Sequence, residues 1–228
     1  HTSIIINSHT FGAIAASDSA TVAGAFKVAV SADVPDQTTN TYAVNITDGT
    51  DNWTSYYTLL MNAPKLQNQS VTINDAGSAN ANNALDVDES ATLNVPVLNT
   101  GHANCGATTV TLSTTSTDVA ITTPVVNFTS LNASATQTAA FPIVVSATAP
   151  LYSNVQFKIV SRCGAYSDTT YFNTKIGAIV EDWESNTFSR YSWVNDATYP
   201  WTIVGTNPQE GSYCAQSGAI TNSQSTTL

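Results

Sequence analysis

The stretch "LDVDESATLNVPVLNTG", residues 85–101, decides the fold class of this chain. Leu93, Val95 and Val97 occupy every second position, so their side chains share one face of an extended chain. The sequence Asn-Thr-Gly at 99–101 is typical of a turn that ends a strand. The stretch therefore predicts a half-buried β-strand, the first of a sandwich.

The rest of the 228-residue chain repeats this pattern of short strands and turns. Hydrophobic residues make up 42% of the sequence and charged residues only 10%, against about 25% charged residues in an ordinary domain. A disordered chain of this polarity would be poorer in aromatic and β-branched residues. The composition and the lack of any helical period predict a folded, all-β protein.

Three units follow one another, each expected to consist of antiparallel strands. Residues 1–64, with a hairpin that turns at Asp48-Gly49, are expected to form an Ig-like β-sandwich. Residues 65–177 contain about seven short strands at a spacing of about 8–12 residues, which predicts a second Ig-like sandwich. Residues 178–228 are too short for an ordinary all-β domain, so they either pack on the second unit or begin a larger domain.

The charge of the chain excludes two classes of partner. The net charge is −10, and only six residues are Lys or Arg. Nucleic acids and anionic membranes are bound by clustered basic residues, so neither is an expected partner. No stretch reaches the roughly 18 apolar residues of a membrane span. The chain opens with "HTSIII", without a signal peptide, and is expected to be a mature protein or a piece of a longer one.

No catalytic motif is present, so we expect this chain not to be an enzyme. Gly-x-Ser-x-Gly, His-Glu-x-x-His and phosphate-binding Gly loops are absent from the sequence. His102 precedes Cys105 by three residues on one loop, but this spacing does not direct the two side chains toward each other. We therefore favour no nucleophile and base pair.

The three cysteines leave two interpretations open. Cys105 and Cys163 both lie where a loop meets a strand of the second unit, and a disulfide between them would close a long loop. Alternatively, both of these and Cys214 are small buried thiols. A zinc site from Cys105, Cys163 and His102 lacks a fourth ligand.

Two acidic clusters have the oxygen ligands that calcium prefers. The first contains Asp75, Asp86, Asp88 and Glu89, without the spacing of an EF-hand. We favour its interpretation as the solvated start of a strand, where acids keep a sheet edge from pairing with other chains. The second cluster is Glu181, Asp182 and Glu184.

Aromatic residues suggest either a core or a platform on which a sugar ring stacks. Trp53, Tyr57 and Leu59 share one parity, and such alternating aromatics favour a core position for Trp53. The alternative is a carbohydrate-binding surface that includes Trp53 and Trp201.

Two stretches resemble known families. Residues 84–103, "ALDVDESATLNVPVLNTGHA", resemble the opening of CARDB-like, Ig-like adhesion modules, although no Gly precedes Glu89 here. Residues 181–220 resemble the start of the jelly-roll domains of gingipain-type adhesins and of MAM-like domains. The matching residues, in order, are Asp182-Trp183-Glu184, Trp193, Trp201-Thr202-Ile203, Glu210-Gly211 and Ser217-Gly218. Residues 25–64 are similar to the sandwich that precedes the CARDB-like module in large secreted peptidases of Bacteroidetes.

The resemblance implies tandem Ig-like sandwiches, 1–64 and 65–177, followed by an incomplete jelly roll, 178–228. It implies a non-catalytic C-terminal region of a secreted or cell-surface gingipain-type or subtilisin-like peptidase, acting as a spacer or docking module. Its expected partners are the parent's catalytic domain and a surface protein or glycan. Because jelly rolls of this family hold calcium near their first strand, Asp182 and Glu184 are its candidate ligands. The alternatives are a carbohydrate-binding or host-adhesion module and a structural cell-surface subunit.

Overall fold

The protein is described from a computed structural model, which covers residues 1–78, 81–177, 183–189, 193–209 and 211–228. The regular elements within these ranges are all β-strands, and all pairs between strands are antiparallel. The predicted all-β fold class is therefore confirmed. No helix that could cross a membrane occurs in these ranges. The chain divides into two compact units, His1–Gly177 and Ala178–Leu228.

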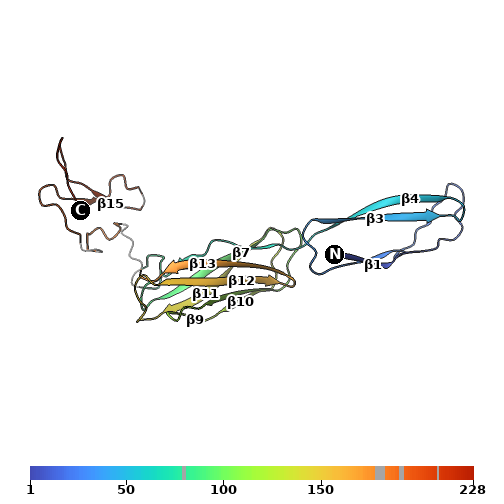
Figure 1. Ribbon diagram of the computed structural model, residues 1–228, viewed down its shortest axis with the longest axis horizontal. Helices are drawn as coiled ribbons and strands as arrows, with labels where there is room; N and C mark the ends of the chain where they lie inside the picture. The colour runs from blue at the N-terminus through green and yellow to red at the C-terminus, as the bar shows by residue number, and fades with distance from the viewer. Residues whose placement is uncertain (79–80, 178–182, 190–192, 210) are drawn as a thin grey trace. The chain divides into compact units, whose positions relative to one another are not determined.

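Residues 65–177 form a β-sandwich of two sheets (Figure 1). One sheet has the order β10-β8-β12-β13, and the other has the order β5-β7-β11-β9, with β6 also paired to β7. The strands are β5 (Leu66–Asn68), β6 (Thr72–Asn74), β7 (Ser90–Asn99), β8 (Thr108–Thr114), β9 (Val119–Ile121), β10 (Val125–Phe128), β11 (Thr136–Val145), β12 (Asn154–Cys163) and β13 (Tyr166–Lys175).

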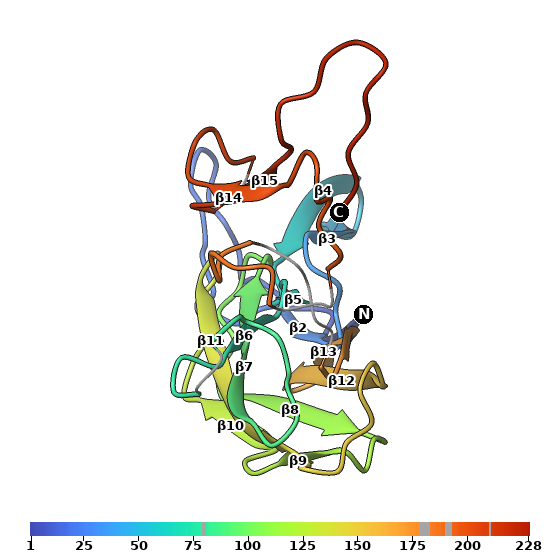
Figure 2. The same cartoon turned by 90° about the vertical axis from the view of Figure 1, so that its left-hand side faces the viewer.

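The two sheets enclose one hydrophobic core, and Figure 2 shows the layers nearly end-on. In β7 the burial alternates along the strand, with Leu93, Val95 and Val97 completely buried. Phe141 in β11 and Phe157 in β12 are equally inaccessible and belong to the same core. Burying one such side chain stabilises the fold by about 1.5–3 kcal/mol relative to leaving it exposed. The strand predicted from alternation in residues 85–101 is confirmed.

The N-terminal strands pair as two separate sheets of two strands each. They are β1 (Thr2–Ile6) with β2 (Lys27–Val30), and β3 (Thr38–Thr47) with β4 (Asn52–Met61). The hairpin predicted around Asp48-Gly49 is confirmed, because Ile46 pairs with Trp53 and Tyr42 with Tyr57.

The N-terminal region differs from the full sandwich expected for residues 1–64. Its separate cluster of buried residues contains only Val34, Met61 and Ala63, with Leu59 and Tyr166 packed against it. The physical reason is that sheets of two strands are too narrow to enclose a core between them.

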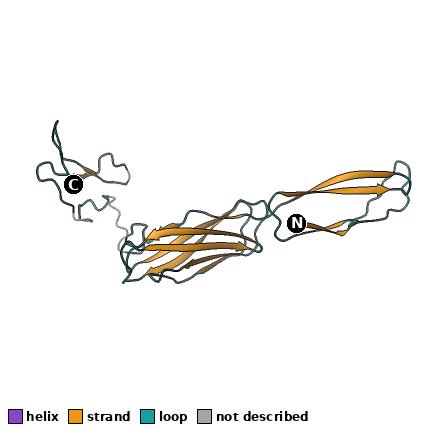
Figure 3. Cartoon of the chain, viewed as in Figure 1, coloured by secondary structure: helices purple, strands orange, loops and turns teal. Residues whose placement is uncertain are grey.

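The C-terminal unit contains one short sheet, β14 (Thr202–Val204) with β15 (Cys214–Gln216). Figure 3 shows that most of its described chain is loop. Of the motif residues that resemble a jelly roll, Thr202 and Ile203 of the Trp-x-Ile motif lie in β14. The strand β15 lies between Gly211 and Ser217, and neither of these two residues is in a strand. Of the jelly roll expected here, the described residues form this one strand pair.

Candidate functional site: the joint and the open strand

A set of polar contacts connects the N-terminal strands to the sandwich. We call it the joint; it comprises residues 33–36 and 61–65 on one side and residues 99–105 and 163–166 on the other. Its centre is Asn99, which is completely buried. The Asn99 Oδ1 accepts hydrogen bonds from the Lys65 N–H (3.0 Å) and the Gly101 N–H (3.1 Å).

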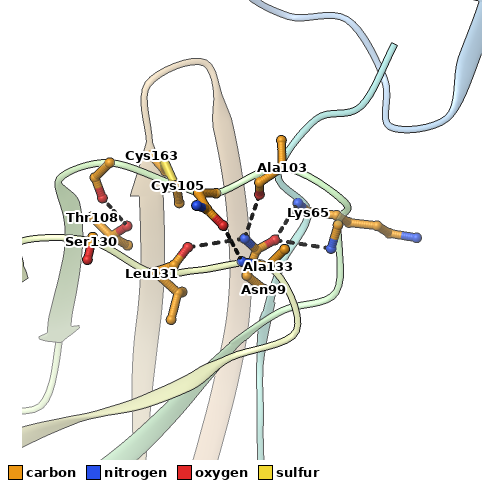
Figure 4. Close-up of a disulfide and its surroundings, with 12 residues drawn as sticks. Lys65, Asn99, Ala103, Cys105, Thr108, Ser130, Leu131, Ala133 and Cys163 are labelled. Atoms are coloured by element: carbon orange, nitrogen blue, oxygen red, sulfur yellow. Dashed lines mark hydrogen bonds between the residues drawn. A yellow bond between two sulfur atoms is a disulfide. The ribbon is translucent and has the colours of Figure 1, made fainter. Parts of the chain in front are cut away.

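The Asn99 Nδ2 donates to two carbonyl oxygens, those of Ala103 (2.9 Å) and Leu131 (3.2 Å) (Figure 4). The side-chain amide thus makes all four hydrogen bonds that an Asn can make. Because each partner is a backbone group, the amide fixes three backbone segments relative to one another. The Asn-Thr-Gly turn predicted from sequence is therefore also the attachment point of the linker that arrives from the N-terminal strands.

Gly101 is required by a close approach of the linker. A Cβ atom at this position would lie 2.3 Å from the Ala63 carbonyl oxygen and 2.5 Å from the Lys65 nitrogen. Both are backbone atoms, which cannot move aside as a flexible side chain does. Only glycine lets residues 63–65 pack directly on the turn.

Asp36 and His102 form the second contact of the joint. The Asp36 Oδ2 lies 2.7 Å from the His102 Nδ1, and the Asp36 Oδ1 accepts hydrogen bonds from the Ala63 N–H (2.9 Å) and the His102 N–H (3.3 Å). Burial acts to raise the pKa of Asp36, but the hydrogen bonds from Ala63 and His102 outweigh it, and the pKa is lowered from its ordinary value. The joint is therefore built around an ionised carboxylate.

Tyr166 and a disulfide complete the joint. The Tyr166 hydroxyl donates to the Val34 carbonyl oxygen (2.8 Å), and burial together with the charges of Asp33 and Asp36 raises the pKa of this tyrosine. Cys105 and Cys163 form a disulfide (Figure 4). This bond connects the loop that carries Gly101 and His102 to the end of β12, next to the short turn that leads into Tyr166 at the start of β13. The two parts of the sandwich that touch the N-terminal strands are thus covalently tied together.

The disulfide also determines what chemistry this loop can do. Cys105 and Cys163 have no thiol for nucleophilic attack or for zinc, while the His102 Nδ1 is in contact with Asp36. The structure therefore brings His102 and Cys105 into one joint rather than into a catalytic pair. The third cysteine, Cys214, has a half-buried thiol in the C-terminal unit.

The second candidate is the open strand β4. Trp53 is 52% exposed and Tyr57 is 61% exposed, so the expected core position for Trp53 is wrong. The reason is the placement of the β1–β2 sheet: Thr2 receives hydrogen bonds from Asn40 and Tyr42, both on β3. The side chains of β3 on this face are mostly half-buried, while those of β4 are mostly exposed. Trp53 and Tyr57 therefore form an uncharged aromatic surface.

Trp201, the other predicted aromatic ligand, is less accessible. It is half-buried, and its backbone N–H and C=O are both hydrogen-bonded to the side chain of Asn195 (2.7 and 2.8 Å). Its indole Nε1 is buried and has no hydrogen-bond partner among the described residues. Trp53 and Trp201 belong to different units of the chain.

The predicted calcium ligands of the C-terminal unit are Asp182 and Glu184, and the structure describes only the second of them. Asp182 lies outside the described residues, as does Glu181. Glu184 accepts hydrogen bonds at Oε1 from the N–H groups of Ser212 (2.7 Å) and Tyr213 (3.0 Å). A Cβ atom on Gly211 would lie 2.3 Å from that oxygen, which explains the Gly in this turn. Glu184 thus caps a turn, and within the described ranges no three His, Cys, Asp or Glu side chains form a metal-binding group.

The first acidic cluster is only in part the solvated strand start that the sequence predicts. Asp75 is only 2% exposed and Glu89 only 5%, whereas Asp86 is half-buried and Asp88 is exposed. The Asp75 Oδ2 accepts hydrogen bonds from the N–H groups of Asn82 (2.8 Å) and Asn83 (2.9 Å). The Glu89 Oε2 accepts one from the Asp86 N–H (2.9 Å). These hydrogen bonds fix the backbone of Asn82, Asn83 and Asp86 before β7.

Comparisons with known proteins add no family. No family model matches the chain, and no curated protein matches it. Among solved structures, the chain is similar to PapD-like domain 7 of human CEP192, with 9% identity over 42% of this chain and 77% of that domain and a TM-score of 0.29. It is also similar to a family 123 glycoside hydrolase from Clostridium perfringens, with 9% identity over 49% of this chain and 27% of that enzyme and a TM-score of 0.30.

A third similar structure is a β-glucosidase from Listeria innocua, with 14% identity over 54% of this chain and 17% of that enzyme and a TM-score of 0.28. The chain thus spans about a quarter or less of the two enzymes. None of the three similarities supports an argument about function, and the proposals below rest on the geometry of this chain.

Proposed function

We propose that this chain is a non-catalytic accessory region of a secreted or cell-surface bacterial protein, with a peptidase as the expected parent. Its role is to hold a docking surface at a fixed distance and orientation from the parent's catalytic domain. The observation that carries the proposal is the joint, in which Asn99, Gly101 and the pair Asp36–His102 fix the linker to the sandwich.

A flexible tether needs none of these features. Neighbouring domains move relative to each other by default unless their interface is specific and well packed. Here a buried amide uses all its hydrogen-bonding groups on backbone atoms, and a disulfide ties together the two loops that make the contacts. Such a connection transmits orientation, which is the property that a spacer requires.

Backbone dynamics in solution test this proposal directly. We expect ¹⁵N relaxation of the labelled full chain to give one rotational diffusion tensor for residues 1–64 and 65–177. Two independent tensors would show a flexible connection and contradict the spacer role. A peptidase assay on the isolated chain is the companion measurement, and hydrolysis that disappears in Cys105→Ala would overturn the non-catalytic assignment.

The exposure of Trp53 favours one alternative, a carbohydrate-binding or host-adhesion module. Aromatic side chains exposed on a flat, uncharged surface have the amphipathic faces on which sugar rings stack. Trp53 and Tyr57 lie on β4, in which no residue carries a charge.

A glycan array distinguishes the alternative from the spacer. Binding that is lost in Trp53→Ala, and kept in the matched control Trp201→Ala, would establish carbohydrate recognition at β4. If no glycan binds, the open face of β4 remains a docking surface for a protein, and in the spacer proposal it receives a neighbouring domain of the parent.

A further inference from the structure

The end of the sandwich opposite the joint contains two buried carboxylates on the same face. Asn74 pairs with Thr92, so the next residue, Asp75, stands opposite Ala91 and diagonally across from Glu89. Residues in this diagonal relation lie on one face of a sheet, about 7–8 Å apart, within reach of long side chains. Asp75, Glu89 and Ala91 are all buried, so the side chains of Asp75 and Glu89 face the interior of the sandwich.

No basic side chain in the described part of the chain forms an ion pair with these two acids. The ion pairs among the described residues join His1 to Asp33 and His102 to Asp36, and neither involves Asp75 or Glu89. A buried carboxylate is costly unless it is paired, protonated or bound to a metal. Two buried carboxylates at the same end of a sandwich, in a chain with a net charge of −10, repel each other and increase that cost.

Two oxygen atoms at this end of the sandwich are buried and have no partner. The Glu89 Oε1 and the Ser78 Oγ are inaccessible to solvent and make no hydrogen bond with the described residues. The other carboxylate oxygen of Glu89, Oε2, is held by the Asp86 N–H. The Glu89 carboxylate is therefore fixed in orientation and keeps one oxygen available within the loop.

We propose that the loop between β6 and β7 binds a calcium ion through Asp75 and Glu89, with Ser78 Oγ as a further ligand. Residues 75–89 contain neither His nor Cys, so the donors are hard oxygens, which suit calcium rather than zinc. Backbone carbonyls and water complete the six to eight oxygens that calcium takes. With two buried carboxylates, the affinity belongs to the range of extracellular calcium modules, with a Kd of about 10⁻⁴–10⁻³ M.

The site has a mechanical consequence for this unit. Leu85, inside the same loop, forms a bridge with Ile176, and its carbonyl oxygen accepts a hydrogen bond from the Gly177 N–H (2.7 Å). Calcium would therefore stabilise the loop to which the last residues of the first unit are attached.

Calcium titration of the full chain tests the proposal. After EDTA treatment and dialysis, CaCl₂ is added while ¹H–¹⁵N spectra and thermal unfolding are recorded. We expect saturable chemical-shift changes within residues 75–89 and a rise in Tm of several degrees, with MgCl₂ giving at most a small part of either. Two results would overturn the proposal. One is a set of chemical-shift changes that spread over the acidic surface without saturating, and the other is an unchanged Tm at a calcium concentration about ten times the upper end of the expected Kd range.

Two variants separate a calcium ligand from a purely structural glutamate. Glu89→Gln keeps an acceptor for the Asp86 N–H but removes the charge, so calcium affinity should fall at least tenfold. In EDTA this variant should unfold at the wild-type temperature or above it, because the buried charge is gone.

The matched control is Asp88→Asn, which removes one exposed charge from the same loop. Asp88 has a φ of 62°, a conformation that Asn adopts readily, so calcium affinity should stay within twofold of the wild type. If Glu89→Gln lowers Tm equally with and without calcium, Glu89 has a structural role only, and the proposal is wrong.

Discussion

The strands β7 and β4 are both ten residues long and both place large apolar side chains on one face, Leu93, Val95 and Val97 in β7 and Trp53 and Tyr57 in β4, yet only the face of β7 is buried. β7 has neighbours on both sides in its sheet, and the second sheet covers its apolar face. β4 pairs with β3 alone, and most of its side chains are exposed. The difference shows that alternation determines which side chains share a face, whereas burial depends on whether another layer covers that face.

The largest expected effect is the difference in stability lost when a buried aromatic ring of the sandwich and an exposed aromatic ring of β4 are each replaced by alanine. Phe157→Ala removes a completely buried ring and should lower the free energy of unfolding by about 3–5 kcal/mol. Tyr57→Ala removes an exposed ring and should change it by no more than about 0.5 kcal/mol. Urea denaturation of both variants measures the contrast. A large loss in Tyr57→Ala would mean that β4 is covered in solution.

Removal of the disulfide should give the next largest loss in the free energy of unfolding. Cys105 and Cys163 are 58 residues apart, and closing a loop of that length stabilises the fold by about 4 kcal/mol in the chain-entropy model. The double variant Cys105→Ser/Cys163→Ser should therefore lose about 2–4 kcal/mol, measured by urea denaturation without reductant. Reductant should lower the stability of the wild type and leave that of the double variant unchanged. Cys214→Ser is the control, because this cysteine is not part of a disulfide.

A substitution of Gly101 should have a smaller effect on stability but should let the N-terminal strands move independently of the sandwich. Gly101→Val places a side chain on the Ala63 carbonyl and should push the linker off the turn. We expect a loss of about 1–3 kcal/mol, the range for overpacking, with residues 1–64 tumbling separately in ¹⁵N relaxation. Gly106→Val is the control, since a Cβ atom there meets no atom within 4 Å. One common tensor in Gly101→Val would show that the close approach does not hold the joint.

The sequence was sufficient for the features that depend on local pattern. The alternation of Leu93, Val95 and Val97 predicts their common buried face, and the Asp48-Gly49 turn predicts the β3–β4 hairpin. The fold class follows from many such signals that agree with one another.

The sequence was not sufficient where distant segments meet. Asp36 and His102 are 66 residues apart, and nothing near either of them indicates the contact. The sequence favours a solvated Glu89 because acids are rarely buried, and its burial depends on how distant strands of the sandwich surround the start of β7. The exposure of Trp53 depends on a covering layer that lies over β3 and not over β4.

The smallest expected effect is the pH dependence of the stability that Asp36 contributes at the joint, where the open N-terminal strands meet the buried sandwich. The pKa of Asp36 is lowered in the folded chain, so the stability it contributes is fully present above its unfolded pKa of about 3.9. That contribution is lost as the pH falls through the lower, folded pKa. The difference in unfolding free energy between wild type and Asp36→Asn should therefore be constant from pH 7 to 5 and shrink below about pH 4. Denaturation curves at pH 7, 5, 4 and 3 measure it, and a difference that grows toward acid pH would contradict an ionised Asp36 in the joint.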